Sequence, residues 1–154
     1  MSSLKEGDKA PNFTAKDQDG NAISLSDFKG KKVILYFYPQ DNTPTCTKEA
    51  CNFRDNYQSL LGKGFQVIGV SFDTEKSHQK FIKKFSLPFP LVADPDKKII
   101  EAYGVWGEKT LFGRNYMGTL RTTFIIDEKG KIEHIINKVD SGNASQQVLD
   151  LLNK

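Results

Sequence analysis

The stretch Lys31-Lys32-Val33-Ile34-Leu35-Tyr36-Phe37-Tyr38-Pro39 decides the fold. It is rich in β-branched and aromatic residues and has no polar alternation after its two lysines, which is typical of a central strand covered on both faces. Its final proline ends the strand. Apolar residues then recur at helical spacing from Pro44 to Leu61, and Gly62 and Gly64 follow as a stop signal. A buried strand followed by a long helix is the first half of a βαβ unit.

The alternation of strands and helices continues along the chain. Residues 65–72 predict a second buried strand and residues 74–85 a second helix. Upstream, a turn cluster at 17–21 predicts a hairpin. The other expected segments are a short strand at 91–93, a short helix at 97–103, an irregular segment at 107–118, a hairpin formed by 119–126 and 131–137, and a closing helix at 144–153. This order predicts an α/β fold, a thioredoxin-like sandwich with a central mixed sheet flanked by helices.

Length and composition limit the classes of protein that this chain can be. Its 154 residues, 38% of them hydrophobic, suit a single domain, expected to span residues 1–154. The 22 basic and 19 acidic side chains leave a net charge of +3 and form no long basic run, so no nucleic-acid partner is expected. The longest apolar run, Val33 to Tyr38, is too short to span a membrane, so no membrane association is expected. Residues 1–8 have no apolar signal core, and we expect a cytoplasmic protein.

The chain has only two cysteines, too few for a disulfide scaffold, which directs attention to their chemistry. Cys46 follows the most hydrophobic strand, and with Thr43 as N-cap and Pro44 as first helical residue it lies in the first turn of the long helix. Free backbone N–H groups and the positive end of the helix dipole stabilise a thiolate there, which is the nucleophilic form. Position alone is equally compatible with an inert core cysteine, because Cys46 shares a helical face with Ala50, Phe53 and Tyr57.

Cys51 and the two histidines raise further alternatives. Cys51 points to another side of the helix, among polar residues, so an inert core role suits it less well. Two cysteines and two histidines could in principle hold zinc, but His78 and His134 lie far apart on different predicted elements. We expect His78 on the surface of its helix and His134 in a strand. No metal and no cofactor are expected, and neither histidine adjoins Cys46 in a way that indicates a cysteine protease pair.

The segment around the cysteines carries a specific resemblance. The spacing C-x-x-x-x-C excludes the C-x-x-C motif of dithiol exchange proteins. Residues 38–51 contain Pro39, Thr43 and Cys46 in the pattern P-x-x-x-T-x-x-C, which resembles the active-site signature of the peroxiredoxins. A second cysteine five residues later, directly after Glu49-Ala50, is similar to the bacterioferritin comigratory protein (PrxQ) subfamily of thiol peroxidases. Blocks at 7–13, 70–73, 91–94, 103–107 and 121–127 are also similar to that subfamily, whereas Thr45 replaces an expected glycine and Gln40 an expected lysine.

The resemblance implies a thiol-dependent peroxidase that reduces hydrogen peroxide and organic hydroperoxides and serves antioxidant defence. Cys46 would be the peroxidatic nucleophile and would become a sulfenic acid, and Cys51 would resolve it by forming an intramolecular Cys46–Cys51 disulfide. Thioredoxin, or alternatively glutaredoxin, would reduce that disulfide. Members of the subfamily are often monomers, and we expect a monomer here.

The resemblance also implies roles for four supporting residues. The Thr43 hydroxyl, with the backbone N–H groups around Thr45 and Cys46, would position the peroxide, and Pro39 would shield the thiolate. Arg121 would supply a fixed positive charge, although an arginine in a strand is more often a solvated residue. Glu49 would hold Arg121 by a salt bridge, and an ordinary charge on the helix surface is an equal alternative.

Two rival functions remain at this stage. One is a disulfide exchange protein, and the other is a thioredoxin-fold binding module or holdase whose cysteines are incidental. Rapid loss of both thiols on addition of hydrogen peroxide would distinguish a peroxidase from either, because ordinary thiols react far more slowly.

Overall fold

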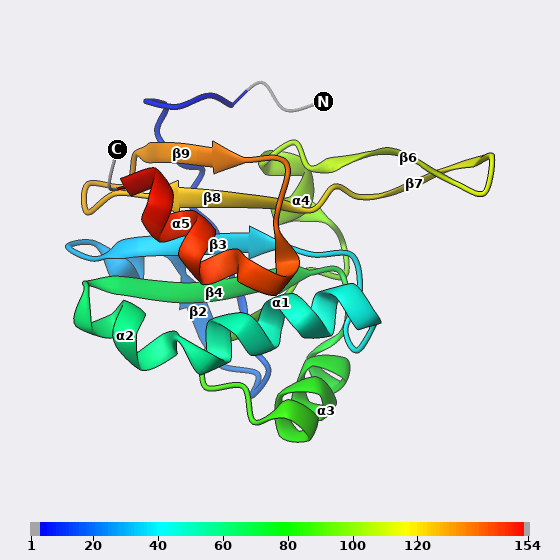
Figure 1. Cartoon of the computed structure of the whole chain (residues 1–154), viewed down its shortest axis with the longest axis horizontal. Helices are drawn as coiled ribbons and strands as arrows, with labels where there is room; N and C mark the ends of the chain where they lie inside the picture. Colours follow the sequence, from blue (N-terminus) through cyan, green and yellow to red (C-terminus); the bar gives the residue numbers. More distant parts are fainter. Residues whose placement is uncertain (1–3, 153–154) are drawn as a thin grey trace.

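The structure is a computed structural model, and it describes residues 4–152. Its centre is a seven-stranded mixed sheet in the order β2-β1-β5-β4-β3-β8-β9 (Figure 1). The strands are β1 (Thr14–Lys16), β2 (Ala22–Ser24), β3 (Lys32–Phe37), β4 (Phe65–Ser71), β5 (Leu91–Ala93), β8 (Thr122–Ile126) and β9 (Ile132–Ile136).

Strand β3 is the axis of the sheet. It pairs in parallel with β4 and antiparallel with β8, and β4 pairs in parallel with β5. Its side chains alternate between two cores: Ile34 and Tyr36 belong to one, and Leu35 and Phe37 to the other. Both faces are therefore covered, as the unbroken apolar stretch predicts.

Helices cover the two faces of the sheet. The helices are α1 (Pro44–Asp55), α2 (Tyr57–Gly62), α3 (Glu75–Phe85), α4 (Lys98–Ala102) and α5 (Ala144–Leu152), with 3-10 turns at Leu25–Phe28 and Ser141–Asn143. Side chains of α1, α2, α3 and α5 build one core, and those of α4 and the N-terminal segment build the other. Figure 1 shows α1, α2 and α5 crossing in front of the strands. The expected mixed sheet flanked by helices is confirmed, and none of the described helices is long and apolar enough to cross a membrane.

The predicted long helix over 44–61 is wrong in one respect, because the structure divides it. Asn56 separates α1 from α2 with φ −111° and ψ 6°, outside helical geometry. Its side-chain amide donates to the Asn52 carbonyl at 2.8 Å, and asparagine is prone to such bonds, which compete with the helical ladder.

The segment predicted to be irregular, 107–118, is a hairpin in the structure. Strands β6 (Trp106–Leu111) and β7 (Arg114–Thr119) pair antiparallel and extend away from the body of the molecule (Figure 1). Phe112 and Gly113 form the turn with φ values of 53° and 76°, the pair of positive angles that a two-residue hairpin turn requires. The expected strand over 119–126 is correspondingly shorter, because Thr119 belongs to β7 and Arg121 lies in the connection before β8.

The remaining expected elements are present, with small changes of boundary. The N-terminal hairpin, the helix at α3, the strand β5 and the hairpin of β8 with β9 lie where the sequence predicts them. The closing helix begins at Ala144 as expected, and the predicted last residue, Asn153, lies outside the described residues. His134 is in β9, as expected.

Candidate active site

Cys46 is the third residue of α1, directly beyond the carboxyl end of β3. Thr43 caps the helix in an extended conformation, with φ −91° and ψ 156°, and Pro44 is the first helical residue. The first helical hydrogen bond runs from Thr47 N–H to the Thr43 carbonyl at 2.8 Å. The amides of Thr45 and Cys46 consequently have no acceptor within the helix. No acidic residue occupies this first turn, so a Cys46 thiolate would meet the positive end of the helix dipole there.

The sulfur of Cys46 is buried and faces a cation. Only 1% of the residue is exposed, and it packs with Ala50 and Phe53 in the core beneath α1. Arg121, from the connection between β7 and β8, donates from Nη2 to the sulfur at 3.1 Å. Cys46 therefore lies on an apolar face, as an inert cysteine would, but its contact with a guanidinium is the environment of a thiolate.

Glu49 completes a buried charge network with Arg121. Arg121 Nη1 donates to Glu49 Oε1 at 2.7 Å, and the Glu49 side chain is fully buried rather than on the helix surface. Burial raises the pKa of Glu49 from 4.5 to about 7, and the neighbouring Arg121 opposes that rise. Glu49 Oε2 has no hydrogen-bond partner among the described residues. One guanidinium thus bridges the thiol and a carboxylate, each through its own N–H group.

Pro39 and Thr43 lie at the two ends of the loop that joins β3 to α1. The Thr43 hydroxyl donates to the Gln40 carbonyl at 3.1 Å, so its oxygen can still accept a hydrogen bond. Pro39 is partly exposed in the turn that ends β3. The structure gives neither residue a polar contact with Cys46 in the described part of the chain.

Cys51 lies on the same helix, five residues after Cys46, and both thiols are free. Five residues of helix advance about 7.5 Å, so the two Cα atoms are roughly 8 to 9 Å apart. A disulfide requires Cα atoms within about 7 Å. The intact helix therefore keeps the two sulfurs from pairing.

Lys109 is a second cation near the site that the sequence analysis missed. Its Nζ donates to the Thr119 carbonyl at 3.1 Å across the β6–β7 hairpin. Burial, and then the charge of Arg121, lower the pKa of Lys109, whereas Cys46 raises it, which places all three groups within electrostatic range. The segment was expected to be irregular, so nothing indicated where Lys109 would point; the Phe112-Gly113 pair between two extended stretches was the available signal.

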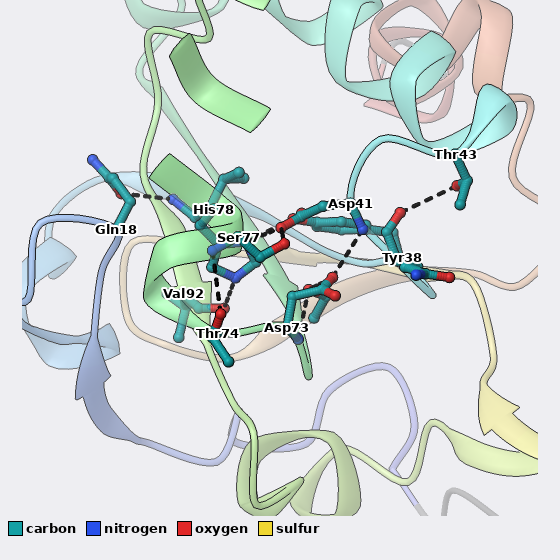
Figure 2. A network of polar contacts seen from close by, with 12 residues as sticks. Gln18, Tyr38, Asp41, Thr43, Asp73, Thr74, Ser77, His78 and Val92 are labelled. Carbon is teal, nitrogen blue, oxygen red and sulfur yellow. Dashed lines mark hydrogen bonds and ion pairs between the residues drawn. The ribbon is translucent and has the colours of Figure 1, made fainter. Parts of the chain in front are cut away.

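The sequence analysis also missed a second buried polar network. It surrounds Asp41, in the loop that joins β3 to α1. His78 is fully buried, so its expected place on the helix surface is wrong. Figure 2 shows it beside Tyr38, Asp41 and Ser77. Metal-ligating atoms of Asp41, Asp73 and His78 lie within 4.8 Å of one another. Protein groups already bond the Asp41 oxygens and both His78 nitrogens, so these residues serve as a hydrogen-bond network.

Comparison with known proteins identifies the family. The model of the AhpC/TSA family matches residues 6–135. A putative peroxiredoxin Bcp of Coxiella burnetii is 52% identical over 137 residues, covering 89% of this chain and 91% of the relative. The peroxiredoxin Bcp of Escherichia coli K12 is 43% identical over 152 residues, covering 99% and 97%. The chain belongs to the AhpC/TSA family, as a peroxiredoxin of the Bcp (PrxQ) type.

Solved structures agree with this assignment. A mutant of the Xylella fastidiosa PrxQ superposes with a TM-score of 0.92 at 31% identity, covering 99% of this chain and 98% of the other. The bacterioferritin comigratory protein of Xanthomonas campestris, studied for alkyl peroxide reduction, superposes with a TM-score of 0.86 at 29% identity, covering 99% and 98%. The expected thioredoxin-like fold is confirmed, and this peroxiredoxin is a thiol peroxidase.

Proposed function

We propose that Cys46 is the peroxidatic nucleophile and that Arg121 holds its sulfur as a thiolate. The observation that carries this assignment is the 3.1 Å contact from Arg121 Nη2 to Cys46 Sγ at the N-terminal end of α1. The guanidinium reaches the sulfur at the helix end where the backbone N–H groups of Thr45 and Cys46 have no acceptor within the helix. Among the described residues no side chain donates a hydrogen bond to Cys51, and Arg54 acts on its thiol only by charge at a distance.

In the first step, the Cys46 thiolate attacks the nearer oxygen of a hydroperoxide ROOH. A sulfur–oxygen bond forms and the O–O bond breaks, giving a sulfenic acid and an alkoxide that leaves as the alcohol after protonation. Charge develops on the leaving oxygen, and donors already directed at the site stabilise it. We assign that role to Arg121 and the amides of Thr45 and Cys46, whereas the Thr43 hydroxyl, which donates to Gln40, positions the peroxide by accepting its O–H, and Pro39 limits access of water to the sulfur. Glu49 orients the planar guanidinium of Arg121 through their ion pair.

In the second step, the Cys51 thiol attacks the Cys46 sulfenic acid. A disulfide forms and water leaves, which protects Cys46 from further oxidation. Because the folded helix holds the two residues roughly 8 to 9 Å apart, this step requires the first turns of α1 to unwind. A dithiol reductant then reduces the disulfide, and we propose thioredoxin for this role, with glutaredoxin as the alternative.

The wider role follows from the site and from the relatives. We propose hydrogen peroxide and organic hydroperoxides as substrates, and the alkyl peroxide reduction studied for the Xanthomonas campestris protein supports the second class. We further propose that the chain works in antioxidant defence as a cytoplasmic monomer, that residues 1–154 form a single domain, and that neither metal nor cofactor takes part.

Thiol counting tests this function. Reduced protein is mixed with one equivalent of hydrogen peroxide, and free thiols and residual peroxide are measured within seconds. The wild type should consume the peroxide and lose both thiols, whereas Cys46→Ser should leave the peroxide untouched. Cys51→Ser should consume one equivalent and retain Cys46 as a sulfenic acid prone to further oxidation, visible by mass spectrometry. Undiminished consumption by Cys46→Ser would refute the assignment, and slow reaction of the wild type would favour a binding module.

A further inference from the structure

The loop that joins β3 to α1 is bonded to the body of the protein mainly at Asp41, and the next residue, Asn42, accepts one exposed hydrogen bond from Lys84 Nζ at 3.3 Å. Asp41 is 8% exposed, whereas its neighbours Gln40 and Asn42 are exposed. The loop carries Thr43 and leads directly to Cys46. Whatever fixes Asp41 therefore fixes the starting point of the peroxide-binding segment.

Four hydrogen bonds from three separate segments converge on Asp41 (Figure 2). The Tyr38 hydroxyl donates to Oδ1 at 2.6 Å, and the Ser77 hydroxyl donates to Oδ2 at 2.7 Å. His78 Nδ1 lies 2.8 Å from the same Oδ2. The Asp41 backbone N–H donates to Asp73 Oδ2 at 2.8 Å. These partners come from the end of β3, from α3 and from the residues after β4, so the loop is bonded to the carboxyl edge of the sheet.

Both ring nitrogens of His78 face an acceptor oxygen. Nε2 lies 3.0 Å from the Val92 carbonyl, which can only accept, and Nδ1 faces the Asp41 carboxylate. The contact between His78 and Asp41 is buried on both sides. Removing either partner leaves a buried polar group without its hydrogen bond, which makes the pair a firm anchor.

The residues immediately after Asp41 are more exposed and make fewer hydrogen bonds than Asp41 does. Asn42 has a left-handed φ of 59°, and it is exposed, as are Pro44 and Thr45. The first turn of α1 contains a proline and threonines, which are weak helix formers, and the Thr43 side chain makes no capping hydrogen bond. A firmly held residue thus borders a weakly held turn.

We propose that the Asp41–His78 pair is a positioning anchor that sets the N-terminal limit of the redox rearrangement. This inference rests on the proposed function, in which α1 unwinds to form the disulfide. The anchor favours the folded loop that binds peroxide and keeps the residues up to Asp41 in place when residues 42 to about 51 rearrange. Loosening it must affect the two steps in opposite directions: peroxide reduction slows, because the loop is less ordered, and disulfide formation accelerates, because α1 starts from a less ordered end.

Rapid-mixing kinetics on the full chain test whether the rates of the two steps change in opposite directions. Asp41→Asn replaces an acceptor oxygen by a donor, and we expect the peroxide step to slow by about tenfold and disulfide formation to accelerate by about tenfold. The matched control is Asp94→Asn, because Asp94 is 5% exposed and accepts from the Ile100 N–H at 2.8 Å away from the loop. Asp94→Asn should change both rates in the same direction or leave both rates unchanged.

Two substitutions of His78 separate positioning from general loss of packing. His78→Asn keeps a donor near the position of Nδ1 and should retain most of the wild-type ratio of the two rates. His78→Gln keeps a donor toward the Val92 carbonyl but loses the contact with Asp41, and should behave like Asp41→Asn. Equal ratios in these two variants, or an unchanged ratio in both Asp41→Asn and His78→Gln, would overturn the proposal.

Amide exchange on the wild type tests the anchor without any variant. Reduced protein is compared with protein converted to the disulfide by a chemical thiol oxidant, so the comparison does not depend on peroxidase activity. We expect faster exchange to begin at Asn42, with the Asp41 amide still protected by its bond to Asp73. Faster exchange that extends back to Asp41 and Tyr38 would overturn the anchor. A wild type that fails to consume peroxide would refute the proposed function instead.

Discussion

Arg121 contacts two groups at once, the sulfur of Cys46 and a carboxylate oxygen of Glu49. Arg121→Met removes the donor to the sulfur, and we expect the rate of peroxide reduction to fall by about tenfold to a hundredfold, since a hydrogen bond to a charged group contributes about 1.5 to 3 kcal/mol. Alkylation of Cys46 by iodoacetamide at neutral pH should slow as well, because less thiolate is present. Stopped-flow kinetics and timed alkylation measure the two effects.

The control for this substitution is Arg114→Met, which removes an exposed arginine from the β6–β7 hairpin. It should leave both rates unchanged. If Arg121→Met alkylates and reduces peroxide as fast as Arg114→Met, Arg121 does not act on the sulfur. Circular dichroism of each variant shows whether the fold is retained.

Glu49 makes the stability of the protein depend on pH. Burial raises the pKa of Glu49 from 4.5 to about 7, so between these values the folded chain keeps a proton that the unfolded chain releases. The free energy of unfolding therefore falls as the pH rises through this window, by about 3 kcal/mol in all. Glu49→Gln carries no proton to lose and should lack this fall. Urea unfolding of reduced protein at several pH values measures it, with Glu108→Gln, an exposed residue, as the control.

Single residues differed in how far the sequence could place them. Cys46 could be placed at a helix start, because Thr43 and Pro44 are local signals of a cap and a first turn. The contact with Arg121 depends on residues from separate segments, so only a family resemblance could suggest it. The burial of His78 could not be foreseen, because its partner Asp41 lies in a loop 37 residues away in the sequence.

At the level of elements, the sheet was predictable and the hairpin at β6–β7 was not. Strand β3 could be predicted from its unbroken apolar run, because both of its faces are covered by helices or loops. The hairpin projects from the molecule, so its strands have no buried face to impose an alternating pattern. Its turn uses Phe112 at a positive φ, where asparagine, aspartate or glycine is the usual residue.

Strand β4 offers a test of packing around the central sheet. A Cβ on Gly69 would lie 2.7 Å from Leu91 Cδ2 and 2.9 Å from Tyr36 Cζ, both in the core. Gly69→Ala should lower the free energy of unfolding by about 1 to 3 kcal/mol, because the core must shift to admit a methyl group. Gly62→Ala is the matched control, since nothing lies within 4 Å of its Cβ position and the residue ends α2. Denaturant titration should show Gly62→Ala as neutral or stabilising; equal loss in both variants would contradict the steric argument.

In the proposed mechanism, the molecule divides into a rigid sheet and one segment, α1, that changes during turnover. Strands β3 and β4 are almost fully buried and pair with each other over six residues, so we expect oxidation to leave them unchanged. In contrast, α1 carries both cysteines and meets the rest of the molecule at its first turn through the Cys46–Arg121 contact. In the proposed mechanism, oxidation of Cys46 to a sulfenic acid removes the thiolate charge that Arg121 faces, which weakens that contact when the helix has to open, while Glu49 still holds Arg121.

We therefore expect the helix from Pro44 to about Cys51 to unwind in the disulfide form, with the change beginning at Asn42. Helical geometry holds the two Cα atoms roughly 8 to 9 Å apart, beyond the about 7 Å that a disulfide spans, so the bond cannot close on an intact helix. Crystal structures or amide exchange of both forms would show the change, and the amides of β3 and β4 serve as the internal control. A Cys46–Cys51 disulfide within an undisturbed α1 would refute the argument. An unwound segment would explain how a nucleophile and its resolving partner share one helix without pairing before peroxide arrives.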